Sequence, residues 1–238
     1  MDTRQHKNYL YEQVARIGKA LCSSKRLELL ELLTQGEKPV ETLAQQAAID
    51  LRLCSAHLRA LREARLVQTQ RAGKHVFYRL ASDEVALLWV TLRDSAERHL
   101  LELQLAMQQL GSHSTSLTRE DRMSLMHRAQ RGEITVIDVR PATEYSCAHL
   151  PFARSLPLSE LRLRIDELPR DQTVVAYCRG PFCVMSDQAV ELLREHGFMA
   201  EKLSDGINEW RAAGLALEVP SPAPTRPNHA RTSSRRMS

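Results

Sequence analysis

The spacing of apolar residues changes once along this chain, at the polar run from Gly111 to Ser116. Before this run apolar residues recur mostly at helical spacing, whereas short continuous apolar runs after it, at 134–138 and 174–177, are typical of buried parallel strands. The 238 residues also exceed one ordinary small domain, because domains run to about 100 to 150 residues. We therefore expect a mainly α-helical domain over 1–110, a linker over 111–116 and an α/β domain with a parallel sheet over 117–218.

Charge is divided unevenly along the same segments. Residues 1–111 carry a net charge of +3, residues 112–218 a net charge of −3, and the last 20 residues hold four arginines and no acid. Four prolines and almost no apolar residue predict a disordered basic tail over 219–238, because such a segment cannot offset its own ordering entropy. No stretch approaches the roughly 18 apolar residues of a membrane span, and the N-terminus lacks a signal-peptide core, so we expect a cytoplasmic protein without membrane contact.

The first half is predicted to be a series of helices with one hairpin. Apolar residues in its last segment form a narrow, nearly heptad stripe over 28 residues, which is more easily buried against another chain than against one small domain. This stripe predicts a homodimer through the helix 83–110. The expected elements are helices at about 5–22, 26–33, 40–48, 51–64 and 83–110, and a hairpin of 66–71 with 75–80.

Positive charge is concentrated between residues 52 and 79, which hold seven basic residues against the single acid Glu63. The helices at 40–48 and 51–64 would form a helix-turn-helix whose second helix enters the major groove of double-stranded DNA, and the hairpin tip would be a wing that touches phosphate. The alternative is a solvated charged face, which the order of the elements disfavours. The predicted DNA-binding residues are Arg52, Ser55, His57, Arg59, Arg62, Arg71, Lys74 and His75.

These residues resemble a known family. The segments ALCSSKRLELLELL, ETLAQQ, CSAHLRALREARLV and GKHVFYRL are similar to the winged helix of ArsR-type bacterial repressors, over nearly all of residues 10–110. The resemblance implies a homodimer on a roughly palindromic operator, with the long last helix in the dimer interface.

The chain also departs from this family. Pro39 to Leu43 stand where metal-sensing members carry paired cysteines, so no thiolate metal site is expected there, and no cofactor. His99 and Glu102 have the spacing of a ligand pair but are expected to be solvated. Arg65 stands where relatives have a helix-ending glycine, which predicts a slightly strained turn.

The sharpest motif of the second half follows the apolar run 174–177. Cys178 stands at the end of an expected buried strand, before a short loop and a helix, where backbone N–H groups, the helix dipole and Arg179 would favour its thiolate. We therefore predict Cys178 as a catalytic nucleophile, the alternative being a buried strand-end thiol. A cysteine phosphatase would need arginine at position 184, where this chain has valine, so the smaller loop suits a single sulfur atom. The active-site loop comprises Arg179, Gly180, Pro181, Phe182, Cys183 and Val184.

A second resemblance covers about residues 117–218. DVRPATEYSCAHLPFA, CRGPFC and LSDGINEWRAAGL are similar to the signatures of a single-domain rhodanese, a sulfurtransferase that carries sulfane sulfur as a cysteine persulfide. By this resemblance a sulfane-sulfur donor and a thiol acceptor are the expected partners. The matching positions Asp138, Arg140, Glu144, His149 and Trp210 are expected to have structural or packing roles.

Departures from the rhodanese pattern bear on the substrate. Ala148 and Phe152 stand where glycines are usual, and Cys183 stands where many members have arginine. The missing cation disfavours anionic thiosulfate and favours neutral or thiol-bound persulfide donors.

The cysteines leave several possibilities open. Cys183 is either a redox partner that forms a disulfide with Cys178 or a small loop residue. Cys54 is expected to be an inert buried thiol, Cys22 is either a sensor thiol or inert, and Cys147 is expected to be structural.

These predictions lead to one principal hypothesis and two alternatives. The principal hypothesis is a dimeric transcriptional repressor whose rhodanese domain forms a persulfide at Cys178 and senses or transfers sulfur. The first alternative is a sulfurtransferase whose winged helix only dimerises or localises it. The second is a repressor with a catalytically silent rhodanese domain.

Overall fold

The computed structural model describes residues 2–73, 75–109 and 119–219. The expected linker at 111–116 and all but the first residue of the expected tail at 219–238 lie outside these residues. The N-terminal part runs through α1 (Thr3–Leu21), α2 (Ser24–Thr34), β1 (Lys38–Pro39), α3 (Val40–Gln46), α4 (Leu51–Glu63), β2 (Val67–Ala72), β3 (His75–Leu80), α5 (Asp83–His99) and α6 (Leu101–Gln109). The C-terminal part runs through α7 (Arg119–Gln130), β4 (Ile134–Asp138), α8 (Ala142–Tyr145), β5 (Arg154–Ser155), α9 (Leu158–Arg164), a 3₁₀ turn (Ile165–Glu167), β6 (Thr173–Tyr177), α10 (Met185–Glu195), β7 (Ala200–Lys202) and α11 (Ile207–Ala212).

The N-terminal part is a winged helix. Its core is built from the leucines of α2 together with the inward faces of α3 and α4, including Leu29, Leu43, Leu58 and Leu61, all buried. The strands form an antiparallel sheet in the order β1-β3-β2, so β1 is the third strand beside the wing hairpin. Arg65, after α4, has φ +60°, which confirms the strained turn expected where a glycine would be usual.

The prediction of one continuous helix over 83–110 was wrong. Leu100 has extended dihedral angles, φ −109° and ψ 104°, and separates α5 from α6. Beyond Arg93, α5 has no further buried residue, whereas α6 buries Met107, so the chain turns to bring a different apolar side chain inward.

The C-terminal part is an α/β layered domain. Its parallel sheet has the order β5-β4-β6-β7. Alternate residues of β4 and β6 face opposite layers: Ile137 and Val174 join a core with α9 and α10, whereas Val136 and Tyr177 join a core with α7 and α11. Both faces of the sheet are therefore covered, as the continuous apolar runs in the sequence predicted.

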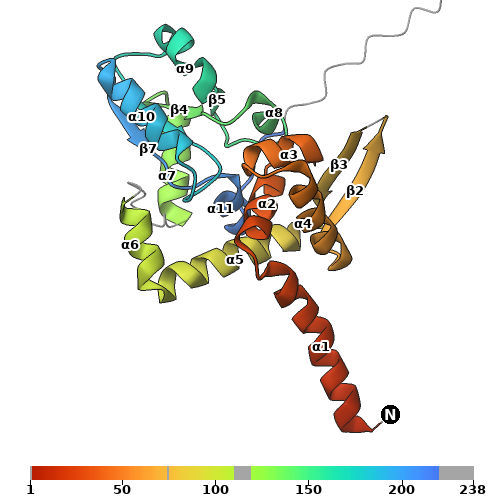
Figure 1. Cartoon of the computed structure of the whole chain (residues 1–238). Helices are drawn as coiled ribbons and strands as arrows, with labels where there is room; N and C mark the ends of the chain where they lie inside the picture. Colours follow the sequence, from red (N-terminus) through yellow and green to blue (C-terminus); the bar gives the residue numbers. More distant parts are fainter. Residues whose placement is uncertain (1, 74, 110–118, 220–238) are drawn as a thin grey trace, which may run out of the picture.

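The two domains pack against each other through α11, which lies beside α5 and near α2 (Figure 1). The long helix α1 projects away from both domains in the same view. Among the described residues no helix combines the length and apolar character that a membrane span requires.

Candidate functional sites

The helix α4 presents one face to the core and another to solvent. Its N-terminus is capped by Asp50, whose carboxylate accepts hydrogen bonds at 2.9 Å from the backbone N–H groups of Arg52 and Leu53. Cys54, Leu58 and Leu61 are buried on the inner face. The predicted contact residues Arg52, Ser55, Arg59 and Arg62 are all exposed, and their spacing of three and four positions places them on one outer face.

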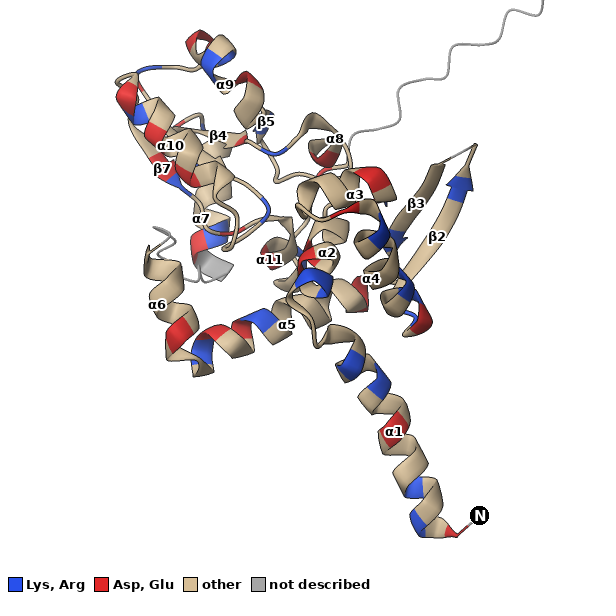
Figure 2. Ribbon diagram, viewed as in Figure 1, with Lys and Arg blue, Asp and Glu red and all other residues tan. Residues whose placement is uncertain are grey.

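The other predicted DNA-binding residues differ in how exposed their side chains are. His57 is half-buried on α4, Arg71 and His75 are exposed on the wing, and Lys74 lies outside the described residues. His75 also faces an acid, since its Nδ1 is 3.8 Å from the Glu41 carboxylate on α3. Figure 2 shows basic residues along α4 and towards the far end of β2, so helix and wing together present positive charge.

Cys178 follows β6 directly and is 1% exposed. Its Sγ lies 3.3 Å from Ser186 Oγ and 3.5 Å from the backbone oxygen of Cys183. Burial alone raises the pKa of Cys178, but hydrogen bonds from the Cys183 and Ser186 side chains and from the N–H groups of Ser186 and Gly180 lower this pKa to about 7. A large fraction of Cys178 is therefore thiolate near neutral pH.

The pKa of Cys183 is shifted in the opposite direction to that of Cys178. The interaction of its half-buried thiol with the neighbouring Cys178 thiolate raises the pKa of Cys183, and burial raises this pKa further. The pair therefore contains one thiolate, at Cys178, and one thiol, at Cys183.

Arg179 is held by a buried carboxylate. Its Nε and NH2 groups donate to the two oxygens of Glu144 at 3.0 Å and 2.7 Å, in a bidentate pair. The sequence predicted that Arg179 would favour the Cys178 thiolate directly. In the structure the thiolate is favoured first by hydrogen bonds within the loop, and the guanidinium is bound to Glu144.

Gly206 supports the loop from the start of α11. A Cβ atom at this position would lie 2.5 Å from the backbone oxygen of Arg179 and 2.8 Å from that of Cys178, so only glycine fits. The backbone N–H of Gly206 donates to Glu209 at 2.6 Å. The sequence showed this glycine as part of a family signature, but its contact with the loop came only from the structure.

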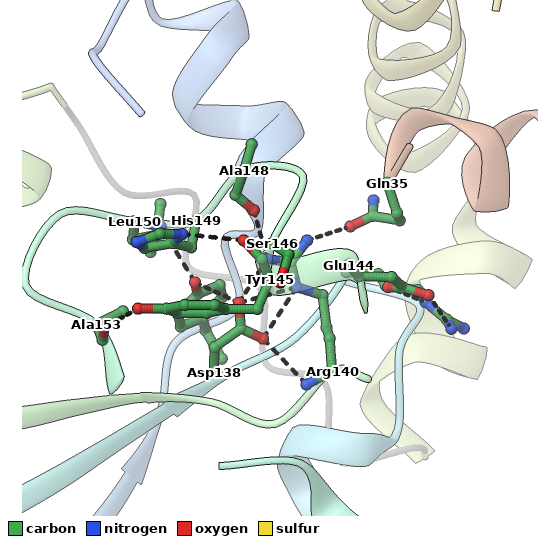
Figure 3. A network of polar contacts seen from close by, with 12 residues as sticks. Gln35, Asp138, Arg140, Glu144, Tyr145, Ser146, Ala148, His149, Leu150 and Ala153 are labelled. Carbon is green, nitrogen blue, oxygen red and sulfur yellow. Dashed lines mark hydrogen bonds and ion pairs between the residues drawn. The ribbon is translucent and has the colours of Figure 1, made fainter. Parts of the chain in front are cut away.

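The first strand of the rhodanese-like sheet ends in a buried polar network (Figure 3). Arg140 donates to Asp138 through Nε at 2.9 Å, and the Tyr177 hydroxyl donates to the same carboxylate at 2.6 Å. His149 is 5% exposed and Trp210 fully buried. These contacts confirm the expected structural and packing roles.

Several polar contacts join the two domains, and none of them was predicted from the sequence. Figure 3 shows Gln35, at the end of α2, next to Arg140 across the interface. The Arg140 NH1 group donates to the side-chain oxygen of Gln35 at 2.7 Å. Further pairs are Arg93 with Glu209 at 2.7 Å, Asn208 with Thr34 at 2.6 Å and Lys38 with Glu144 at 3.2 Å. Single polar residues between leucines give no periodic signal, so no pattern could have revealed these partners.

The remaining cysteines have varied surroundings. Cys54 is buried, and desolvation raises its pKa to about 11, as expected of an inert thiol. Cys22 and Cys147 are exposed. Within the ranges 2–73, 75–109 and 119–219, no group of three or more His, Cys, Asp or Glu side chains is arranged to hold a metal ion.

Both halves of the chain match known protein families. Residues 23–69 match the family model described as "Bacterial regulatory protein, arsR family", and residues 122–213 match "Rhodanese-like domain". The chain is 42% identical over 214 residues to the HTH-type transcriptional regulator Rv0324 of Mycobacterium tuberculosis, an alignment that covers 90% of this chain and 93% of that protein.

Two further relatives each match one half. A sulfurtransferase of Allochromatium vinosum is 32% identical over 102 residues, covering 42% of this chain and 94% of that protein. The biofilm growth-associated repressor of Agrobacterium fabrum is 44% identical over 78 residues, covering 32% of this chain and 65% of that protein. Because the similarity to Rv0324 extends over nine-tenths of the chain, the protein belongs to the ArsR family of winged helix-turn-helix transcriptional regulators and carries a rhodanese-like domain.

Proposed function

We propose that this regulator is a dimeric cytoplasmic repressor that binds double-stranded operator DNA and forms a persulfide at Cys178. The exposed basic face of α4 supports the choice of operator contacts. The observation that carries the sulfur chemistry is the buried Cys178 thiol, whose pKa is lowered to about 7 by loop hydrogen bonds. Hydrogen-bond donors that lower the pKa of a cysteine are typical of reactive thiols, which supports this proposal.

In the proposed reaction the Cys178 thiolate attacks the outer sulfur of a persulfide, R–S–SH. A bond forms between Cys178 Sγ and that sulfur, the donor S–S bond breaks, and the donor leaves as the thiolate RS⁻. The product is Cys178–S–SH, whose added sulfur the N–H groups of Gly180 and Ser186 can stabilise. An acceptor thiolate takes the same sulfur by the equivalent attack, which returns Cys178 to its thiolate.

The charges around the loop support a thiol-bound persulfide as donor. The Arg179 guanidinium is paired with both oxygens of Glu144, and Cys183 contributes a neutral thiol. A dianion such as thiosulfate would therefore enter a largely buried loop without a cation committed to it, at a high desolvation cost. Glutathione persulfide is the probe we select.

Cys183 offers the persulfide a second fate. After losing its proton, the Cys183 sulfur can attack Cys178 Sγ, which forms a disulfide and releases the added sulfur as HS⁻; this ion takes up a proton and leaves as H₂S. The closeness of the two residues favours this step, because Cys178 Sγ lies 3.5 Å from the backbone oxygen of Cys183, whereas the raised pKa of Cys183 slows it. Mass spectrometry separates the two fates, since a persulfide adds one sulfur atom whereas a disulfide removes two hydrogens.

Exposed apolar side chains support the proposed dimer. Leu87, Leu88 and Leu92 remain exposed on α5, although the opposite face of this helix is buried within the chain. The projecting α1 exposes another apolar group, with Tyr9, Leu10, Tyr11 and Val14 each at least 50% exposed. A second copy of the chain would cover both surfaces.

The experiment that tests the proposed function combines two measurements. Glutathione persulfide should add sulfur at Cys178 in the wild type, and Cys178→Ser should lose this site while still binding the DNA upstream of its own gene. Sulfur transfer that survives Cys178→Ser contradicts the assignment of the nucleophile. If the protein transfers sulfur but shows no salt-dependent operator binding, it is a sulfurtransferase whose winged helix is accessory. If it binds DNA but takes up no sulfur, its rhodanese domain is catalytically silent.

A further inference from the structure

The interface between the domains contains a buried lysine from the winged helix. Lys38 belongs to β1, and its side chain is only 7% exposed. Its Nζ lies 3.2 Å from Oε1 of Glu144, whose side chain is 1% exposed. Burial lowers the pKa of Lys38, and the neighbouring Glu144 counteracts this shift. Such a buried ammonium depends on its partner, because an unpaired charge at this depth is very costly.

The same carboxylate is the partner of the sulfur loop. Glu144 Oε1 also accepts a hydrogen bond from Arg179 at 2.7 Å, so this one oxygen contacts a cation from each domain. Arg179 directly follows Cys178 in the loop. The path from the proposed nucleophile to the winged helix therefore passes through only two residues, Arg179 and Glu144.

Lys38 lies where the DNA-reading elements meet. In the antiparallel sheet Lys38 is opposite Tyr78 and Pro39 is opposite Phe77, both on the wing strand β3. The first helix of the helix-turn-helix, α3, begins at Val40, directly after Pro39. Lys38 is therefore connected both to the wing strand β3 and to the start of α3.

We propose that Glu144 couples the sulfur state of Cys178 to operator affinity through its two partners, Arg179 and Lys38. The inference rests on the proposed function, because it requires the persulfide. When Cys178–S–SH loses its proton, the negative charge lies on the outer sulfur, one atom beyond Sγ, and attracts the guanidinium of Arg179, which weakens the hold of Arg179 on Glu144. The carboxylate then binds Lys38 more strongly and displaces β1. Because coupling between two sites is reciprocal, operator binding changes the equilibrium of sulfur loading by the same factor.

The test compares operator Kd values of the reduced and the persulfidated full-length protein, in the wild type and in Lys38→Met. Methionine resembles the lysine stem without its charge, and Glu144 keeps both hydrogen bonds from Arg179, so the variant should fold. The melting temperature of Lys38→Met, compared with that of the wild type, shows whether the variant is folded. The wild-type Kd should change by about fivefold or more, and that of Lys38→Met by less than about twofold.

Two further variants separate coupling from a general effect of substitution. Lys38→Arg keeps the positive charge and should recover most of the wild-type response. Lys19→Met removes the charge of an exposed lysine on α1, away from the interface, and should respond as the wild type does.

The outcomes distinguish the coupling from the proposed function. A folded Lys38→Met protein that takes up sulfur at Cys178 and keeps the full wild-type change in Kd overturns the coupling through Glu144. A wild type that takes up no sulfur at Cys178 overturns the proposed function, and the coupling that rests on it. Loss of the response in Lys38→Met with recovery in Lys38→Arg supports the proposal.

Discussion

The indole ring of Trp89 lies edge-on to the ring of Phe182, with 6.3 Å between the ring centroids and 72° between the planes. Trp89 belongs to α5, the helix that follows the wing, and Phe182 belongs to the loop that carries Cys178. Gly180 of the same loop is also near Arg93 of α5, since a Cβ atom there would lie 3.6 Å from the guanidinium. The DNA-binding domain therefore forms part of the wall of the proposed sulfur site.

The exposed face of α4 predicts how DNA affinity depends on charge. Arg59→Ala should weaken operator binding by about 1–3 kcal/mol if the side chain reaches a base, or lower the salt slope by about one if it neutralises a phosphate. Fluorescence anisotropy with labelled operator at several salt concentrations measures both quantities. Arg98→Ala, at the exposed end of α5, is the control and should leave both unchanged. Equal losses in the two variants would contradict the placement of the DNA-binding face.

The hydrogen bond from Ser186 predicts the pH dependence of Cys178. Alkylation of Cys178 needs the thiolate, so its rate should rise with pH around a midpoint of about 7. Ser186→Ala removes one hydrogen bond to this charged group, worth about 1.5–3 kcal/mol, and should raise the midpoint by about one to two pH units.

Iodoacetamide labelling of the Cys178 peptide, followed by mass spectrometry, measures this midpoint. Ser146→Ala removes a hydroxyl that donates to the backbone oxygen of Ala142 on the surface, and it should leave the midpoint in place. An unchanged midpoint in Ser186→Ala would show that Ser186 does not stabilise the thiolate.

Gly206 predicts a steric requirement of the sulfur loop. Gly206→Ala places a methyl group 2.5 Å from the backbone oxygen of Arg179, which must displace the loop and slow sulfur uptake at Cys178 by about 100-fold. Transfer from glutathione persulfide measures the rate. Gly18→Ala is the matched control, because nothing lies within 4 Å of an added Cβ atom in α1, and its rate should be that of the wild type. Normal transfer by Gly206→Ala would refute the close packing of α11 on the loop.

The turn after α4 predicts a stabilising substitution. Arg65 has φ +60°, a conformation that costs a non-glycine residue about 1–2 kcal/mol, whereas glycine loses about 0.5–1 kcal/mol through chain entropy. Arg65→Gly should therefore increase the free energy of unfolding by about 0.5–1 kcal/mol in urea titrations. Arg62→Gly, one turn earlier in the helix, should decrease it by about 1 kcal/mol. A destabilised Arg65→Gly protein would contradict the inferred strain.

Local pattern accounts for much of what the sequence predicted correctly. The apolar run Ile134–Asp138 is a strand with the expected bounds, and Cys178 stands at the end of β6 before a helix. The face of α4 followed from spacing alone, since every third or fourth residue of a helix shares a side. These features depend on neighbours in the sequence.

The interface between the domains could not be predicted in this way. The periodicity of α5 showed which residues are apolar, but it did not show that Trp89 packs on Phe182 of the sulfur loop or that Arg93 pairs with Glu209 of α11. Lys38 and Glu144 are 106 positions apart, and each alone is an ordinary charged residue. Their pairing depends on how two folded domains dock, which no local pattern describes.

In the proposed mechanism the sulfur state of Cys178 sets operator affinity. Its most direct test is the operator Kd at fixed salt, measured for the wild type and for Cys178→Ser before and after treatment with glutathione persulfide. We expect the wild-type Kd to change by about fivefold or more and to return to its starting value on reduction, whereas the Kd of Cys178→Ser should stay constant. An equal change in both proteins, or a wild type that is loaded with sulfur at Cys178 without any change in Kd, would contradict this mechanism.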